Sequence, residues 1–168
     1  MLVSTTDRHL LFLGTQSILP FTENLSTNPI DPMLIRFSSQ ENISDYTPTA
    51  TNTAGSQRLA AGSKIVGAKV GRSAIYVWTD TSLFTMRFVG DPFTFAFEQV
   101  GTNCGLIGMN AAVEVDGAAY WMSENGFFRY TGKLESMDCL VEDYVYDNIN
   151  LTSNQLIYCG INNLFGEI

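Results

Sequence analysis

The sequence predicts an all-β protein built as an antiparallel meander. Segments rich in β-branched and aromatic residues alternate between apolar and polar positions, turn residues separate them, and helical spacing is rare. The 168 residues are 45% apolar and 12% aromatic, which is enough for one domain with a packed core. We therefore expect a single β-rich domain over residues 1–168.

Three successive hairpins are expected between residues 74 and 132. Their turns fall at residues 80–82, at Asp116-Gly117, which favours a type I′ turn, and at residues 124–126. Between the first two hairpins, residues 93–100 alternate at period two, which places on one face Phe93, Phe95 and Phe97.

The meander repeats at a spacing of 44 residues, because Ile75–Phe84 aligns with Ala119–Phe128. Both copies have an aromatic-bearing strand, a short polar turn and a strand that begins with a large apolar pair. Fainter copies begin at Leu156 and at His9. A period of about 40–45 residues with four strands is typical of a β-propeller blade. We expect blades at residues 65–108 and 109–150 of an incomplete propeller; the alternative is a β-sandwich or barrel.

Several other segments complete the organisation. The polar stretches 15–28 and 42–62 are expected to be long loops that make contacts. Residues 136–149 have apolar positions at helical spacing and predict one short amphipathic helix, with Ser136 as its cap. The end at Leu164–Ile168 resembles the second strand of a hairpin. Its edge would be unpaired, so we expect a piece of a longer protein or completion by neighbouring chains.

The charge argues against a nucleic-acid-binding module. There are 17 Asp and Glu against 9 Lys and Arg, a net charge of −8, and the basic residues are scattered singly. An acidic surface is common on ordinary solvated proteins. It also suits a protein that lines a DNA path, because like charges repel and DNA does not bind to it. No apolar run approaches the ~18–20 residues of a membrane span, so we expect no membrane-spanning helix. The first residues lack a signal-peptide pattern, so we expect no signal peptide.

The sequence offers few groups for catalysis. Its one histidine, His9, lies in an apolar strand and is interpreted as structural. Glu114 and Asp116 lie two positions apart on a strand, but Asp116 is better explained as the first residue of a turn. The cysteines lack the spacing of a zinc site and are expected to be free thiols: Cys104, Cys139 and Cys159. We expect no enzyme, no cofactor and no metal.

The candidate binding residues are two pairs of aromatics, Tyr76 with Trp78 and Tyr120 with Trp121. Their rings could stack on sugars, although core packing between blades is the commoner use of such residues. Both interpretations stay open from the sequence.

A series of motifs spread over most of residues 7–160 resembles a known family. It consists of Pro32–Asn42, Asp45–Gly55, Arg58–Val66, Val77–Phe84, Phe88–Phe95, Gly108–Val113, Tyr120–Met122, Tyr130–Gly132 and Tyr144–Asn150. This series is similar to a family of tailed-bacteriophage virion proteins, whose members are usually longer. Residues 16–28 match nothing in it.

The resemblance implies a structural component of the virion, of the tail. Some tail proteins of this kind, the nozzle or hub proteins, are β-propellers in a ring around the DNA exit channel. The partners implied are copies of itself and other tail proteins, with DNA only as non-specific cargo, and assembly takes place in the bacterial host cytoplasm. The alternative is a phage carbohydrate-binding or glycan-degrading receptor module that uses Trp78, Trp121 and nearby carboxylates.

Overall fold

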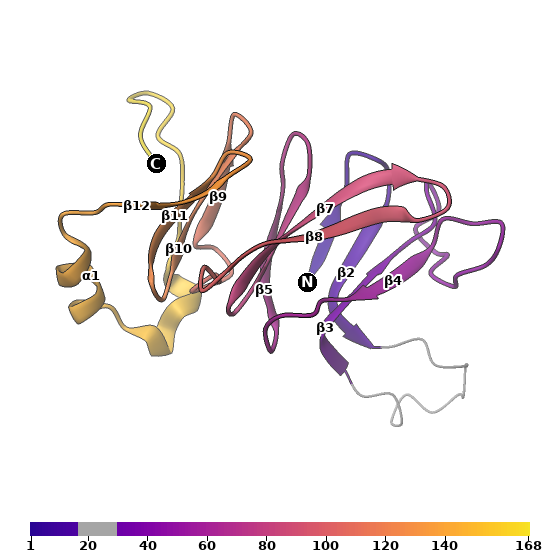
Figure 1. The fold of residues 1–168 in the computed structure, drawn as a ribbon, viewed down its shortest axis with the longest axis horizontal. Helices are drawn as coiled ribbons and strands as arrows, with labels where there is room; N and C mark the ends of the chain where they lie inside the picture. The colour runs from indigo at the N-terminus through magenta and orange to yellow at the C-terminus, as the bar shows by residue number, and fades with distance from the viewer. Residues whose placement is uncertain (17–29) are drawn as a thin grey trace.

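The computed structural model describes residues 1–16 and 30–168 and consists mainly of three four-stranded antiparallel sheets (Figure 1). In each sheet the strands pair in the order in which they follow along the chain, so each sheet is a meander. The strands are β1 Leu2–Ser4, β2 Leu10–Gln16, β3 Ile30–Phe37 and β4 Gly55–Arg58; β5 Ile65–Val70, β6 Ile75–Thr79, β7 Ser82–Gly90 and β8 Thr94–Thr102; and β9 Ala112–Val115, β10 Ala118–Ser123, β11 Gly126–Tyr130 and β12 Leu134–Met137. The expected all-β class is confirmed.

The three sheets follow one another along the long axis of the molecule (Figure 1). The five residues of β6 in the second sheet are all buried, because alternate side chains enter two different cores. Ile75 and Val77 pack with the first sheet, and Tyr76 and Trp78 pack with the third. The second sheet is therefore covered on both faces, unlike a sheet of a two-layer sandwich. None of the described sheets closes on itself as a barrel does.

The first sheet contains most of what the sequence did not predict. Only residues near His9 resembled a strand, and these belong to β2. Residues 55–58 of the stretch expected as a loop (42–62) instead form β4, which pairs with β3. The expected loop 15–28 begins inside β2, and its remainder lies outside the described residues.

The second and third sheets lie inside the two expected repeat units, 65–108 and 109–150. The predicted type I′ turn is confirmed, because Asp116 and Gly117 have φ values of 52° and 87°. The Glu114 carboxylate accepts a hydrogen bond from the Gly117 N–H at 2.9 Å, so it stabilises this turn. The expected shared face of alternate phenylalanines is wrong at Phe93. That side chain is 76% exposed, because it precedes β8 at the tip of the β7–β8 hairpin, whereas Phe95 is buried.

The predicted helix is present but shorter than expected. The helix α1 covers Glu142–Asn148, and a 3-10 helix, η1, covers Leu151–Leu156. Ser136 is not a cap, because it lies in β12 and pairs with Phe128. The faint copy that begins at Leu156 forms no strand pair beyond isolated bridges, one of which joins Asn162 to Glu167.

Among the described residues, no helix is long and apolar enough to cross a membrane.

Candidate interaction surface

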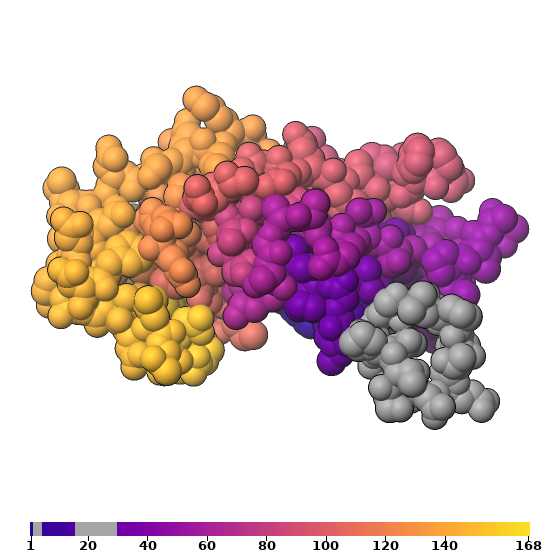
Figure 2. All heavy atoms as spheres, turned by 60° about the horizontal axis from the view of Figure 1, so that its bottom comes forward, coloured from indigo at the N-terminus to yellow at the C-terminus, as the bar shows by residue number. Residues whose placement is uncertain are grey.

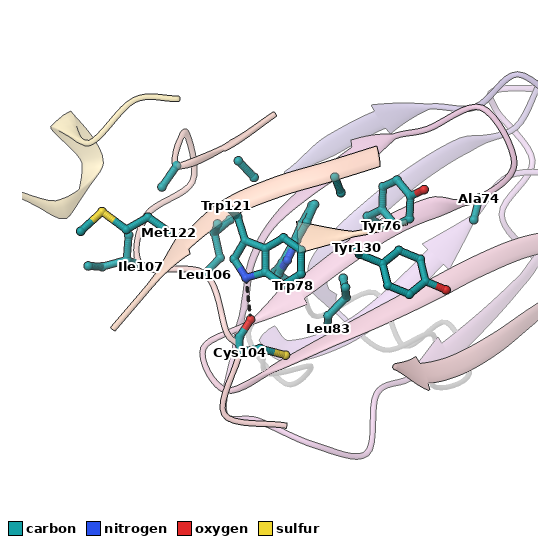
Figure 3. Packing of buried hydrophobic residues seen from close by; sticks show 13 residues of the cluster. Ala74, Tyr76, Trp78, Leu83, Cys104, Leu106, Ile107, Trp121, Met122 and Tyr130 are labelled. Atoms are coloured by element: carbon teal, nitrogen blue, oxygen red, sulfur yellow. Dashed lines mark hydrogen bonds between the residues drawn. The ribbon is translucent and has the colours of Figure 1, made fainter. Parts of the chain in front are cut away.

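Three of the four predicted aromatics lie in the core between the second and third sheets (Figure 3). Tyr76, Trp78 and Trp121 are each no more than 2% exposed. The Trp78 and Trp121 rings meet edge to face with centroids 5.5 Å apart, and the Trp121 indole N–H donates to the Cys104 carbonyl at 2.8 Å. These side chains hold two sheets together and present no face to a sugar.

Tyr120, the fourth predicted aromatic, points the other way. Successive side chains of a strand point to opposite faces, so Tyr120 and Met122 face away from the second sheet while Trp121 faces it. Phe127 pairs with Met122 and with Met137 across the neighbouring strands and therefore shares this side. We call the surface formed by Tyr120, Met122, Phe127 and Met137 the third-sheet outer face.

A groove of about 560 Å³ lies on the third-sheet outer face. One side of it is the sheet, including Tyr120 and Phe127, and the other side is the C-terminal segment, including Tyr158 and Ile168. The thiols of Cys139 and Cys159 also belong to residues that line it. The groove is thus open to solvent, and the third-sheet outer face forms its apolar floor.

The helix α1 is fixed beside this face by Tyr146. The Tyr146 hydroxyl donates to the Ser123 carbonyl at 2.5 Å and accepts from the Gly126 N–H at 3.1 Å, and its ring lies 6.0 Å from that of Phe127. Burial raises the pKa of this hydroxyl. The helix itself has no buried residue, and Tyr144, on its surface, is 72% exposed.

Exposed apolar side chains gather at this end of the molecule. Of the nineteen exposed large apolar residues in the described part of the chain, eleven fall between residues 137 and 168. They are Met137, Leu140, Val141, Tyr144, Leu151, Leu156, Tyr158, Ile161, Leu164, Phe165 and Ile168. Such a concentration of apolar surface is typical of a site that contacts another macromolecule.

The same end carries nearly all of the net charge. Residues 111–168 contain nine Asp and Glu against two Lys and Arg, a net −7, and residues 1–110 contain eight against seven, a net −1. Figure 2 shows the C-terminal residues, in yellow, gathered at one end of the molecule. That end is therefore both apolar and acidic.

The opposite end presents a different surface. Phe12 pairs with Arg36, and Leu34 pairs with Arg58, on the side of the first sheet that faces away from the second. We call the surface of Phe12, Arg36 and Arg58 the first-sheet outer face. Tyr46, from the loop between β3 and β4, lies against it, with its ring 5.0 Å from that of Phe12 and 5.6 Å from the Arg36 guanidinium carbon.

His9 is buried beside the first sheet. Its side chain is 1% exposed, its Nδ1 lies 3.1 Å from the Asp7 carbonyl oxygen and its Nε2 3.3 Å from the Thr53 hydroxyl. The ring also packs against Phe88 and Phe95. Burial lowers the pKa of His9 below its usual value of 6.5.

The remaining candidate groups are thiols and carboxylates. All three cysteines are free; Cys104 is buried, and burial raises the pKa of its thiol and of Cys159. Among residues 1–16 and 30–168, no three His, Cys, Asp or Glu side chains are placed to hold a metal ion.

The groove was missed by the sequence reasoning. Its two sides come from residues 111–128 and 137–168, and only the folded chain brings them together. One feature of the sequence pointed to it. Residues 137–168 contain more large apolar side chains than a single helix of seven residues can bury.

The chain matches no protein-family model and no curated protein. Its two ends differ in chemistry, with an acidic and apolar surface at one end and an arginine-bearing aromatic face at the other.

Proposed function

We propose that this chain is a non-enzymatic structural component of a tailed-phage virion, a tail or nozzle protein beside the DNA channel, which assembles with copies of itself and with neighbouring tail proteins. The observation that carries the proposal is the third-sheet outer face. It is apolar and carries a groove, while the faces between the three sheets are filled by buried side chains. A surface of this kind belongs to a protein that is completed by neighbours.

We further propose that the three sheets are successive blades of an incomplete propeller. Each is a four-stranded meander, and consecutive sheets pack face to face in chain order. This is how neighbouring propeller blades are related. The proposal requires further sheets to follow the third one.

The negative charge supports a position beside DNA rather than DNA binding. With a net charge of −8, the protein repels phosphates, so DNA passes as non-specific cargo. The motifs that resemble virion proteins favour the same setting, the tail of a particle assembled in the bacterial cytoplasm.

Quantitative mass spectrometry of purified virions from the encoding phage tests this function. The expected result is the chain at a fixed copy number in the particle, enriched in isolated tails over heads. A nonsense mutation in its gene is then expected to give particles with incomplete tails. Its absence from purified virions would refute the proposal.

A second candidate function is carbohydrate binding, and one observation favours it. Two tyrosines, Tyr120 and Tyr158, and one carboxylate residue, Asp138, line the groove, a combination that suits a sugar. Buried Trp78 and Trp121 cannot take part. Binding on a glycan array that Tyr120→Ala abolishes, with folding unchanged, would support this candidate. No binding with well-folded protein would remove it.

A further inference from the structure

We propose that Asn125 is a site of spontaneous deamidation and that the helix α1 controls this reaction through Tyr146. The site lies in the turn between β10 and β11, where Ser123 pairs with Gly126. Asn125 is exposed there, at the only position of the sequence where an Asn directly precedes a Gly. The inference goes beyond the proposed virion role and does not depend on it.

The reaction needs the Asn side chain, the backbone nitrogen of the next residue, and water. The Gly126 nitrogen loses its proton to solvent and attacks the side-chain carbonyl carbon of Asn125. A C–N bond forms and closes a succinimide ring, while the bond from that carbon to the side-chain nitrogen breaks and ammonia leaves. Water then opens the ring, which gives aspartate when it adds to one carbonyl and isoaspartate when it adds to the other. A glycine favours ring closure, because it has no Cβ to hinder the approach.

The attacking nitrogen is engaged in the folded protein. The Gly126 N–H donates to the Tyr146 hydroxyl at 3.1 Å, and this hydroxyl donates to the Ser123 carbonyl at 2.5 Å. One phenol group of α1 therefore links the two ends of the turn. Gly126 is also buried, which limits the access of solvent to its backbone. The hydrogen bond and the burial both keep the proton on the Gly126 nitrogen, so the folded state restrains ring closure.

This restraint is only as strong as the attachment of α1 to the third sheet. The helix has seven residues, no side-chain cap and no buried residue. Its Val145 and Tyr146 are partly buried at the margin of the core. A short helix with few buried contacts opens locally at a low cost in free energy. Each opening takes the Tyr146 hydroxyl away from Gly126 and leaves the turn free to react.

The product of the reaction weakens the same attachment. Deamidation adds a negative charge at residue 125, directly after Glu124. The Glu142 carboxylate of α1 already lies at this turn, because its Oε1 is 3.1 Å from the position that a Cβ on Gly126 would take. Like charges this close repel each other. Isoaspartate also inserts a methylene into the backbone of the turn. We therefore expect deamidation to release α1, and the loss of ammonia makes this change permanent.

Two tyrosine substitutions on one helix test the control by Tyr146. Tyr146→Phe removes the hydroxyl and keeps a ring beside Phe127. Tyr144→Phe is the matched control, because Tyr144 is 72% exposed and its hydroxyl makes no hydrogen bond within the described part of the chain. Peptide mass spectrometry after incubation at neutral pH measures the conversion of residue 125 over time, and circular dichroism checks that each protein stays folded.

We expect Tyr146→Phe to deamidate about 5-fold faster than the parent protein, the factor that corresponds to one typical hydrogen bond. Tyr144→Phe is expected to keep the rate of the parent. The parent chain unfolded in urea has no turn and no helix, so it gives the unrestrained rate. We expect this rate to exceed that of every folded protein in the series.

Hydrogen exchange measures the effect of the product on α1 without changing Tyr146. Asn125→Asp supplies the carboxylate of the product, and Asn125→Gln keeps a neutral amide and is the matched control. We expect peptides that cover residues 141–149 to exchange severalfold faster in Asn125→Asp than in Asn125→Gln. The deamidated parent, separated by ion-exchange chromatography, is expected to exchange at least as fast as Asn125→Asp.

Three results would overturn the inference. If Asn125 persists in all folded proteins while it converts in the urea-unfolded chain, it is not a modification site of the native protein. If Tyr146→Phe reacts no faster than the parent, α1 does not control the site through Tyr146. If the two Asn125 variants exchange equally over α1, the product does not release the helix. The proposed virion role is tested separately, by the composition of purified particles.

Discussion

Trp78 and Trp121 meet edge to face between the second and third sheets, but only one of their two indole N–H groups has an acceptor. The Trp121 N–H donates to the Cys104 carbonyl at 2.8 Å, whereas the buried Trp78 Nε1 has no hydrogen-bond partner among the described residues. A buried donor without an acceptor reduces stability. The two tryptophans are therefore unequal although their surroundings are similar.

This difference predicts unequal costs for the same substitution. Trp121→Phe removes indole contacts and leaves the Cys104 carbonyl without its donor, so we expect a loss of about 3 kcal/mol of unfolding free energy. Trp78→Phe removes similar contacts together with an unsatisfied donor, and we expect a loss smaller by about 1–2 kcal/mol. Urea denaturation followed by circular dichroism measures both, and equal losses would contradict the prediction.

Gly105 is expected to be intolerant of any side chain. A Cβ there would lie 2.1 Å from the Asp80 carbonyl oxygen, because residues 104–106 run beside the end of the β6–β7 hairpin. We expect Gly105→Ala to cost about 3 kcal/mol or more. In the control, Gly160→Ala, the nearest atom belongs to the exposed Tyr158 ring at 3.0 Å, which can rotate away, and we expect a change within about 0.5 kcal/mol. Thermal denaturation of the two variants provides the comparison.

Mild acid is expected to destabilise the protein through His9. Burial lowers the pKa of His9 in the folded state, so below its usual value of 6.5 the unfolded chain binds a proton more readily than the folded one. The free energy of unfolding therefore falls as the pH drops through 6.5, and this fall ends below the folded-state pKa. His9→Asn keeps an N–H donor for the Asp7 carbonyl but does not titrate.

Urea denaturation at pH 7.5, 6.5 and 5.5 checks this prediction. We expect His9→Asn to be less stable at pH 7.5, because its contacts with Phe88 and Phe95 are lost, but to show a smaller decrease toward pH 5.5. Parallel pH profiles for the two proteins would show that His9 is not responsible.

The cysteines are expected to differ in reactivity toward iodoacetamide. Burial raises the pKa of Cys104 and its side chain is 0% exposed, so it has little thiolate and no access to the reagent at pH 7.5. Peptide mass spectrometry is expected to find Cys104 unlabelled in the native protein and labelled in urea. Rapid native labelling of Cys104 would mean that the contact between the second and third sheets opens readily.

The elements that the sequence predicted are those with a local signal. The strand at Ile75–Thr79 is rich in β-branched and aromatic residues, and Asp116-Gly117 is specific for its turn. The strand Gly55–Arg58 carries no such signal, because its polar side chains are exposed and only pairing with β3 defines it. Long-range pairing of this kind is not encoded in neighbouring residues.

At the candidate surface, too, local features could be predicted from the sequence and long-range ones could not. Residues at i and i+2 of a strand share a face, so Tyr76 and Trp78 lie together in the core. Tyr120 and Trp121 are adjacent and must point to opposite faces, which the sequence already implied. The sequence does not predict that Tyr158 lines the same groove as Tyr120, because the path of the chain after α1 decides it.

The meander order of the strands has a consequence for biosynthesis. Each sheet uses only consecutive residues, so its hydrogen bonds can form as soon as its own segment has left the ribosome. The apolar faces of each sheet, in contrast, remain exposed to solvent until the next segment is synthesised and packs against them. Throughout translation the newest sheet therefore exposes an apolar face, and the third-sheet outer face is covered only in part, by Tyr146 of α1 and by the segment that includes Tyr158.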